Sequence, residues 1–189
     1  LLGMPVHYRD ARTEGMMEKA FETVSKKEIF ERTGLAFQSF NTLYQLLAMK
    51  EQGDEALEAA DTLLFMPDLI AYLLTGAKAT EYTIASTSQM IDPSTRSWDK
   101  ELLKKLGLPA GILTEIQPAG TVRGLLKEEI ARETGLPQVP VIAVASHDTA
   151  SAVAAVPADK GSRFAYISSG TWSLLGAELK SPLCRAEAM

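Results

Sequence analysis

Two short segments of the chain carry residue types that suit group transfer. An apolar run at residues 141–145 is followed by Ser146, His147 and Asp148. A second apolar run, at residues 164–167, leads into a turn of small residues made of Ser169, Gly170 and Thr171. About 23 residues separate the carboxylate from this turn. A carboxylate that accepts a proton, paired with a turn that holds a phosphate, would suit transfer of a phosphoryl group to a hydroxyl.

The sequence around Asp148 allows two roles for its carboxylate. Ligands of open α/β sheets gather at the carboxyl ends of strands, and a carboxylate there can take a proton from an attacking hydroxyl. Asp is also a favoured N-cap, and Asp148 directly precedes an Ala-rich helical segment at residues 149–156. The two roles can coexist. The neighbouring His147 could contact a sugar hydroxyl or fill a polar gap.

The turn at Ser169, Gly170 and Thr171 also allows two interpretations. Successive backbone N–H groups and a hydroxyl can cradle an anion, with glycine permitting close approach. The same residues would make an ordinary hairpin turn between strands at residues 163–168 and 172–179. The chain carries neither a P-loop nor a GxGxxG motif. Its two histidines, His7 and His147, show no metal-binding spacing.

Helical periodicity dominates residues 11–74. We therefore expect helices to position the segments around Asp148 and Gly170. A capping box at residues 25–28 predicts a helix that ends at Gly34, and Asn41 is placed to cap a helix over residues 42–50. Residues 81–83 are interpreted as structural. The pattern then changes: residues 139–145 predict a strand buried on both faces, and residues 157–161 predict a linker.

Composition excludes several classes of protein. The chain has 189 residues, 46% of them hydrophobic, so it can build a core. Its net charge of −5 and the lack of a basic cluster disfavour nucleic-acid binding. No apolar run is long enough to cross a membrane. The single Cys184 fits a reducing compartment, and we expect a cytoplasmic protein. The start without Met and the end soon after a strand predict a piece of a longer protein.

Taken together, these segments resemble the FGGY family of carbohydrate kinases. The matching motifs follow one another in the family's order: HYRDART at 7–13, NTLYQL at 41–46, MPD at 66–68, LTG at 74–76, EYT at 81–83, WD at 98–99, ASHDTASAV at 145–153 and SSGTWSL at 168–174. The resemblance implies an α/β fold of the actin-like ATPase, ribonuclease-H-like type. It would be incomplete, with residues 1–157 as the latter part of the sugar-binding domain and residues 158–189 as the start of the ATP-binding domain.

The resemblance also implies roles for individual residues. Asp148 matches the catalytic base, and His147, Asp148 and Thr149 match the triplet that contacts the substrate. Gly170 and Thr171 match a loop that meets the ATP phosphates. ATP and Mg²⁺ would be required, with no metal ligand assigned in this chain. Its partners would be a small-molecule sugar and ATP, with no nucleic acid and no membrane. The sequence leaves the oligomeric state open.

Within the family, the matches at residues 41–46 and 66–68 favour the kinases that convert L-rhamnulose to L-rhamnulose 1-phosphate. A kinase of L-fuculose or xylulose and a non-catalytic sugar-binding module remain alternatives. Family members carry further motifs before residue 1 and after residue 171. We therefore expect this chain to be inactive by itself.

Overall fold

Short helices and two-stranded sheets make up the computed structural model, which describes residues 1–159, 161–170 and 172–189. The α-helices are α1 Met16–Thr23, α2 Lys26–Thr33, α3 Thr42–Glu51, α4 Glu55–Ala59, α5 Met66–Thr75, α6 Tyr82–Ser86, α7 Lys100–Lys105, α8 Glu128–Thr134 and α9 Asp148–Ala154. The 3₁₀ turns are η1 Ala11–Thr13, η2 Ala110–Ile112 and η3 Ala186–Ala188. The strands are β1 Thr80–Glu81, β2 Ile91–Asp92, β3 Ser97–Trp98, β4 Ile116–Gln117, β5 Val122–Leu125, β6 Pro140–Ile142, β7 Ala165–Ser169 and β8 Ser173–Ala177.

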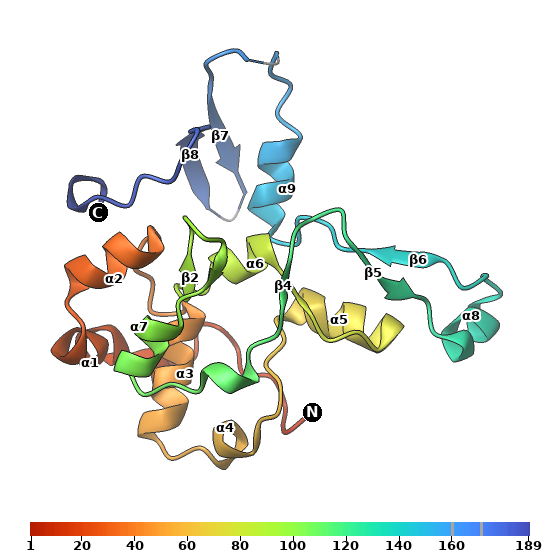
Figure 1. Cartoon of the computed structure of the whole chain (residues 1–189), viewed down its shortest axis with the longest axis horizontal. Coiled ribbons are helices and arrows are strands. Elements are labelled where there is room, and N and C mark those ends of the chain that lie inside the picture. The colour runs from red at the N-terminus through yellow and green to blue at the C-terminus, as the bar shows by residue number, and fades with distance from the viewer. Residues whose placement is uncertain (160, 171) are drawn as a thin grey trace.

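The strands pair two by two. β1 pairs with β4 in parallel, whereas β2 with β3, β5 with β6 and β7 with β8 are antiparallel. Figure 1 shows a helical body built from α1, α2, α3, α4 and α7. The β7–β8 hairpin and α9 stand at one side of this body, and α5, β5, β6 and α8 extend from it as an arm.

The helical body surrounds the core. Its fully buried side chains include Ile29 of α2, Leu43 and Tyr44 of α3, and Leu102 and Leu103 of α7. In α3, Leu43, Leu46 and Leu47 recur at helical spacing, so this helix turns an apolar face inward. Since such short helices are marginal alone, burial of their apolar faces supplies most of their stability.

Local capping sets several helix ends as the sequence predicts. The Ser25 hydroxyl accepts a hydrogen bond from the Glu28 amide at 3.2 Å, and Gly34 ends α2 with a left-handed φ of +62°. Asn41 is the N-cap residue of α3, but its side chain makes no capping bond. It donates instead to the carbonyl of Ala36 and to Oε1 of Gln89, both at 3.1 Å. The position of this cap was predicted correctly and the role of its side chain was not.

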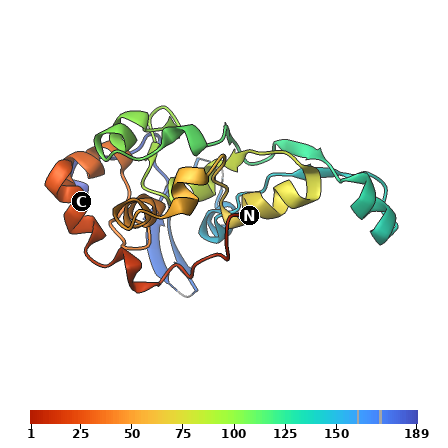
Figure 2. The ribbon, with the colours of Figure 1, turned by 90° about the horizontal axis from the view of Figure 1, so that it is seen from below.

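The prediction of a strand buried on both faces at residues 139–145 is wrong. Only Pro140–Ile142 form a strand, β6, and it pairs antiparallel with β5 in a ribbon that α5 contacts. Val139, Ile142 and Val144 are 38%, 45% and 64% exposed. Figure 2 shows this arm projecting from the body with α8 at its far end. An apolar run is typical of a buried strand, but the tertiary structure decides how many of the strand's faces other elements cover.

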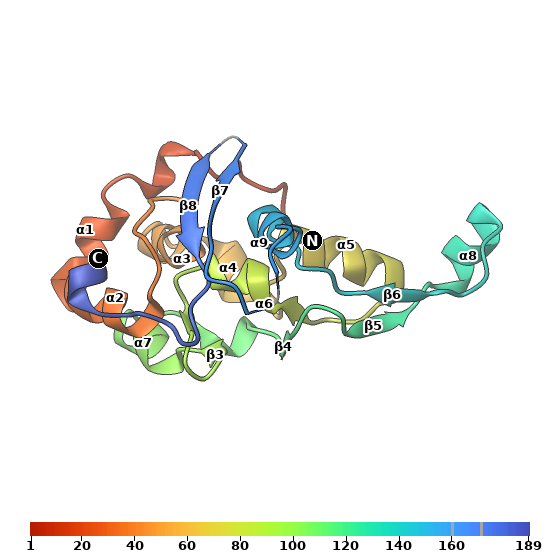
Figure 3. The same ribbon diagram turned by 90° about the horizontal axis from the view of Figure 1, so that it is seen from above.

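The predicted hairpin near the end of the chain is confirmed. β7 and β8 pair from Ala165 with Ala177 to Ser169 with Ser173. α9 packs against β7, and Figure 3 shows the hairpin lying beside α9 and over the side of the body that carries α3. Among the described residues, no helix combines the length and the apolar character that a membrane span requires.

Candidate active site

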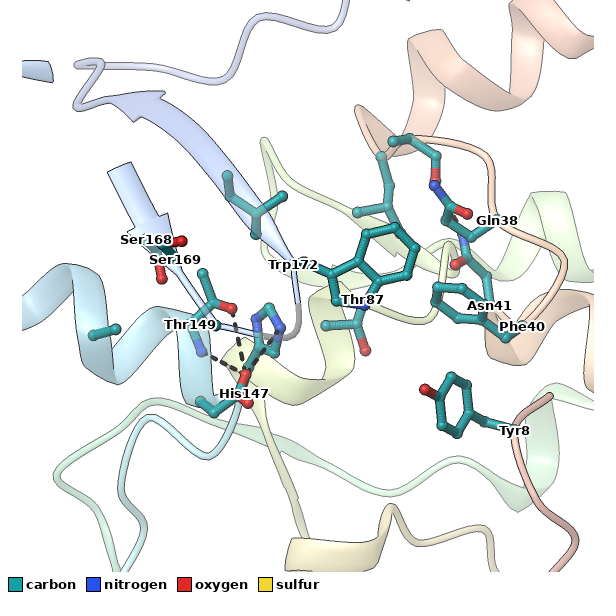
Figure 4. A pocket seen from close by; sticks show the side chains of 16 residues that line it. Tyr8, Gln38, Phe40, Asn41, Thr87, His147, Thr149, Ser168, Ser169 and Trp172 are labelled. Atoms are coloured by element: carbon teal, nitrogen blue, oxygen red, sulfur yellow. Dashed lines mark hydrogen bonds and ion pairs between the residues drawn. The ribbon is translucent and has the colours of Figure 1, made fainter. Parts of the chain in front are cut away.

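A cavity of about 680 Å³ lies where the body, α9 and the β7–β8 hairpin meet. Its walls come from the loop at residues 35–41, from the start of α9, and from the end of β7 with the turn that follows. Figure 4 shows His147 and Thr149 on one side, and Gln38, Phe40 and Asn41 on the other. The two segments singled out from the sequence therefore meet at one cavity.

Asp148 is the first residue of α9, and the N-cap position belongs to His147. Of the two roles that the sequence allowed for Asp148, the structure does not give it the N-cap position. Its side chain is 97% exposed, and Oδ1 accepts hydrogen bonds from the Thr149 amide at 2.6 Å and the Thr149 hydroxyl at 3.3 Å. Within the described part of the chain, Oδ2 makes no hydrogen bond. The carboxylate thus lines the cavity with one oxygen held by Thr149 and the other available to a ligand.

His147 and Thr149 flank this carboxylate and also line the cavity. Nε2 of His147 lies 3.7 Å from Oδ1 of Asp148, and the His147 amide donates to the Thr83 hydroxyl at 3.2 Å. The three residues expected to contact the substrate are therefore together, with polar atoms suited to hydroxyl groups.

Glu81 holds the segment that leads into His147. Its Oε2 accepts hydrogen bonds from the Ser146 amide at 3.1 Å and the Ser146 hydroxyl at 2.8 Å. Burial pushes the pKa of Glu81 upward, but the hydrogen bonds from Thr83 and Ser146 outweigh this and bring the pKa below its ordinary value. The sequence interpretation of Glu81 as structural missed this link. The sequence carries no signal for it, because Ser146 lies 65 residues away along the chain.

The turn expected to meet phosphate is described only in part. Thr171 lies outside the described residues. Gly170 lines the cavity, and a side chain there would meet open space, so a ligand can approach its backbone. The Gly170 amide, however, donates to the carbonyl of Trp172 at 2.8 Å. It would have to leave that partner before it could bind a phosphate, and the role of the turn stays a prediction.

Aromatic residues form the wall that faces α9. Phe40 lies 6.3 Å from Trp172, between ring centroids, and Tyr8 contacts Phe40 edge-on at 5.5 Å. Figure 4 shows Trp172 between the His147 side and the Asn41 side of the cavity. Such faces suit the C–H surface of a sugar. The sequence interpretation did not identify Phe40 or Trp172 as part of this wall.

In kinase sites Mg²⁺ is usually held by one or two carboxylates together with the phosphates of the substrate, and not by an all-protein cage. Over residues 1–159, 161–170 and 172–189, the structure brings together no group of three or more His, Cys, Asp or Glu side chains that could hold a metal ion. We therefore assign no Mg²⁺ ligand to the described residues.

Comparison with known proteins gives three findings. The model of the FGGY family of carbohydrate kinases, N-terminal domain, matches residues 1–155. A rhamnulokinase from Bacteroides thetaiotaomicron is 49% identical over 188 residues, which is 99% of this chain and 38% of that protein. A rhamnulokinase from Oceanobacillus iheyensis is 45% identical over 184 residues, 97% of this chain and 38% of that protein.

Solved structures show the same fold. The xylulose kinase from Rhodospirillum rubrum superposes with a TM-score of 0.73 at 24% identity, covering 82% of this chain and 32% of that one. This confirms the expected actin-like α/β fold, of which the chain carries a part. The chain spans little more than a third of the length of the curated relatives described above. The match over residues 1–155 shows that the chain belongs to the FGGY family of carbohydrate kinases.

Proposed function

We propose that this chain supplies the sugar-facing wall and the general base of an ATP-dependent kinase. The complete enzyme transfers the γ-phosphoryl group of ATP to L-rhamnulose and yields L-rhamnulose 1-phosphate and ADP. One observation carries the proposal. The exposed carboxylate of Asp148, held by Thr149, lines a cavity of about 680 Å³ together with polar and aromatic side chains, and this cavity has room for a small sugar. The sequence likeness to two rhamnulokinases supports the choice of sugar.

In this proposal each residue has one step in the reaction. A sugar hydroxyl placed against Asp148 gives its proton to the carboxylate as its oxygen attacks the γ-phosphorus. The new O–P bond forms while the bond from the γ-phosphorus to the bridging oxygen breaks, and ADP leaves with that electron pair. Thr149 fixes one carboxylate oxygen, so the other accepts the proton. His147 binds a second hydroxyl and orients the ring.

Binding energy in the cavity comes from both walls. Phe40 and Trp172 pack against the carbon face of the sugar, and polar groups on the α9 side select hydroxyl positions. Gly170 and Thr171 meet the phosphates of ATP in this proposal, with Gly170 releasing its bond to the Trp172 carbonyl. ATP would arrive as its Mg²⁺ complex.

The proposal divides the chain at residue 157. Residues 1–157 are the latter part of the sugar-binding domain, and residues 158–189 begin the ATP-binding domain. The family match ends at residue 155, one residue after the end of α9, and β7 and β8 pair only with each other among the described strands.

The proposed reaction consumes ATP, which is abundant in the cytoplasm. We therefore propose a cytoplasmic location for the complete enzyme.

The test uses the complete protein that contains this chain. A coupled assay of ADP release compares L-rhamnulose, L-fuculose and xylulose, and we expect the highest kcat/KM with L-rhamnulose. A higher value with either other sugar would overturn the assigned substrate. ADP release with none of them, despite sugar binding, would favour a non-catalytic module.

A variant tests the base. Asp148→Asn keeps the shape of the side chain and removes its ability to take a proton. Since a general base contributes about 10²–10⁴-fold, kcat should fall by that range. The melting temperature should stay near that of the parent protein, because the Asp148 side chain is exposed. Near-normal kcat in this variant would refute the assignment.

A further inference from the structure

Glu81 is a carboxylate buried to 1% exposure that joins two separate segments of the chain. On the helix side it caps α6: Oε1 accepts from the Thr83 amide at 2.8 Å, and Oε2 accepts from the Thr83 hydroxyl at 2.5 Å. On the other side Oε2 accepts from the amide and the hydroxyl of Ser146. Such bonds to an ionised acceptor are stronger than those between neutral groups. An ordinary helix cap needs only the first set.

Thr83 extends this connection by one residue. Its hydroxyl donates to Glu81 and, with its lone pairs, accepts from the His147 amide at 3.2 Å. The backbone amides of Ser146 and His147 are therefore both fixed from α6. Asp148 follows directly, and its amide begins α9.

The other end of the connection is a buried ion pair. The Glu81 amide donates to Oδ1 of Asp68 at 3.0 Å, and Nη2 of Arg123 contacts the same oxygen at 2.6 Å. The side chains of Asp68 and Arg123 are 1% and 2% exposed. An element held this way from the interior is rigid, because moving it would strand buried polar groups.

We propose that Glu81 and Thr83 are positioning residues, which fix the Ser146–His147 backbone and so present Asp148 to the sugar hydroxyl in one orientation. This inference rests on the proposed role of Asp148 as the base. The cavity itself gives Asp148 little support, since the carboxylate is held only by Thr149 in the described part of the chain. Orientation must come from the backbone, and Glu81 and Thr83 fix that backbone from α6.

The experiment changes the hydroxyl that links α6 to His147, in the complete protein. Thr83→Val replaces Oγ1 with a methyl group of similar size, and Thr83→Ser keeps the hydroxyl. Thr80→Val is the matched control. Thr80 is fully buried next to Glu81, but its hydroxyl pairs with that of Thr114 at 2.6 Å and does not lead to Asp148.

Three readouts separate positioning from stability: kcat and KM in the ADP-release assay, the melting temperature, and amide hydrogen exchange across residues 145–149. Thr83→Val should lower kcat by about 10- to 100-fold, the cost of misplacing a reacting group, with a smaller change in KM. The His147 amide should exchange faster, because its acceptor is gone. Thr83→Ser should restore both values. Thr80→Val should lower the melting temperature and leave kcat and His147 exchange unchanged.

Unchanged kcat and a still-protected His147 amide in Thr83→Val would overturn the inference. An equal loss of kcat in Thr80→Val would overturn it too, because the effect would then follow stability. Asp148→Asn is measured alongside. Near-normal turnover in Asp148→Asn refutes the proposed base and this inference with it. Loss of turnover there, with full turnover in Thr83→Val, refutes the inference alone.

Discussion

The ion pair between Asp68 and Arg123 gives a sharp prediction about stability. Nη2 of Arg123 lies 2.6 Å from Oδ1 of Asp68, and both side chains are almost fully buried. Arg123→Met removes the cation and keeps an apolar chain of comparable length. It leaves the Asp68 carboxylate in the interior without its counter-charge.

The size of the loss follows from the surroundings of the pair. Breaking a buried ion pair by removing one partner costs about 3–5 kcal/mol. Oδ2 of Asp68 and the Nε and Nη1 atoms of Arg123 find no hydrogen-bond partner among the described residues. Burial also raises the pKa of Asp68, against the pull of its partners, so protonation can relieve part of the loss. We therefore expect the lower end, about 3 kcal/mol.

A double variant isolates the charge. Asp68→Asn keeps Oδ1 as the acceptor for the Glu81 amide, which an apolar residue would leave unpaired. In Asp68→Asn/Arg123→Met both charges are gone and that hydrogen bond survives. Because replacing a whole buried pair is often neutral, the double variant should recover about 2 kcal/mol relative to Arg123→Met.

Urea unfolding of the complete protein at neutral pH, followed by circular dichroism, measures these differences. Linear extrapolation gives the free energy of unfolding of the two single variants and the double variant. A loss below about 1 kcal/mol in Arg123→Met would place the pair in the weak class of surface ion pairs and refute the reasoning. Strict additivity of the two single losses would refute it as well.

Two further predictions concern buried polar side chains. The pKa of Glu81 lies below its ordinary value of about 4.3, so its stabilisation is full above that pH and is lost as the pH falls through the folded-state pKa. The unfolding free energies of the parent and Glu81→Gln should therefore converge on acidification, and a pH-independent difference in urea titrations would contradict this. Gln89 adopts φ +62°, donates to the Leu35 carbonyl and accepts from Asn41. Gln89→Ala should lower stability by about 2–3 kcal/mol and raise KM for the sugar by loosening the wall at Asn41, and a kinetic assay with unchanged KM would contradict the second effect.

The sequence predicted helix ends where the stabilising contact is local. Ser25 and Gly34 act within a few residues of the helix that they bound, so their types suffice. Asn41 shows the limit of this reasoning. It stands at the expected position, but Gln89, 48 residues away along the chain, takes its side chain. An asparagine can either cap a helix or form a hydrogen bond to a distant segment, so the residue type alone does not say which of the two it does.

The candidate site was also predictable only in part, because its residues come from segments far apart in the sequence. The motif around His147 and Asp148 identified the group that could react, and the resemblance to a family placed it beside a sugar. The pattern allowed Asp148 to be a helix cap or a base, and the structure gives the cap position to His147. Phe40 and Trp172 were missed, because an aromatic residue next to a helix or a turn says nothing about the cavity it faces.

By itself, the sequence determined the family, the helical start of the chain and the hairpin at its end, and it pointed to Asp148, which we propose as the base. These depend on residue types and on short spacings. The tertiary structure decided that Glu81 reaches Ser146 across 65 residues and that Asp68 meets Arg123 across 55. Buried polar groups need partners, and only the packing of distant segments selects which partners meet.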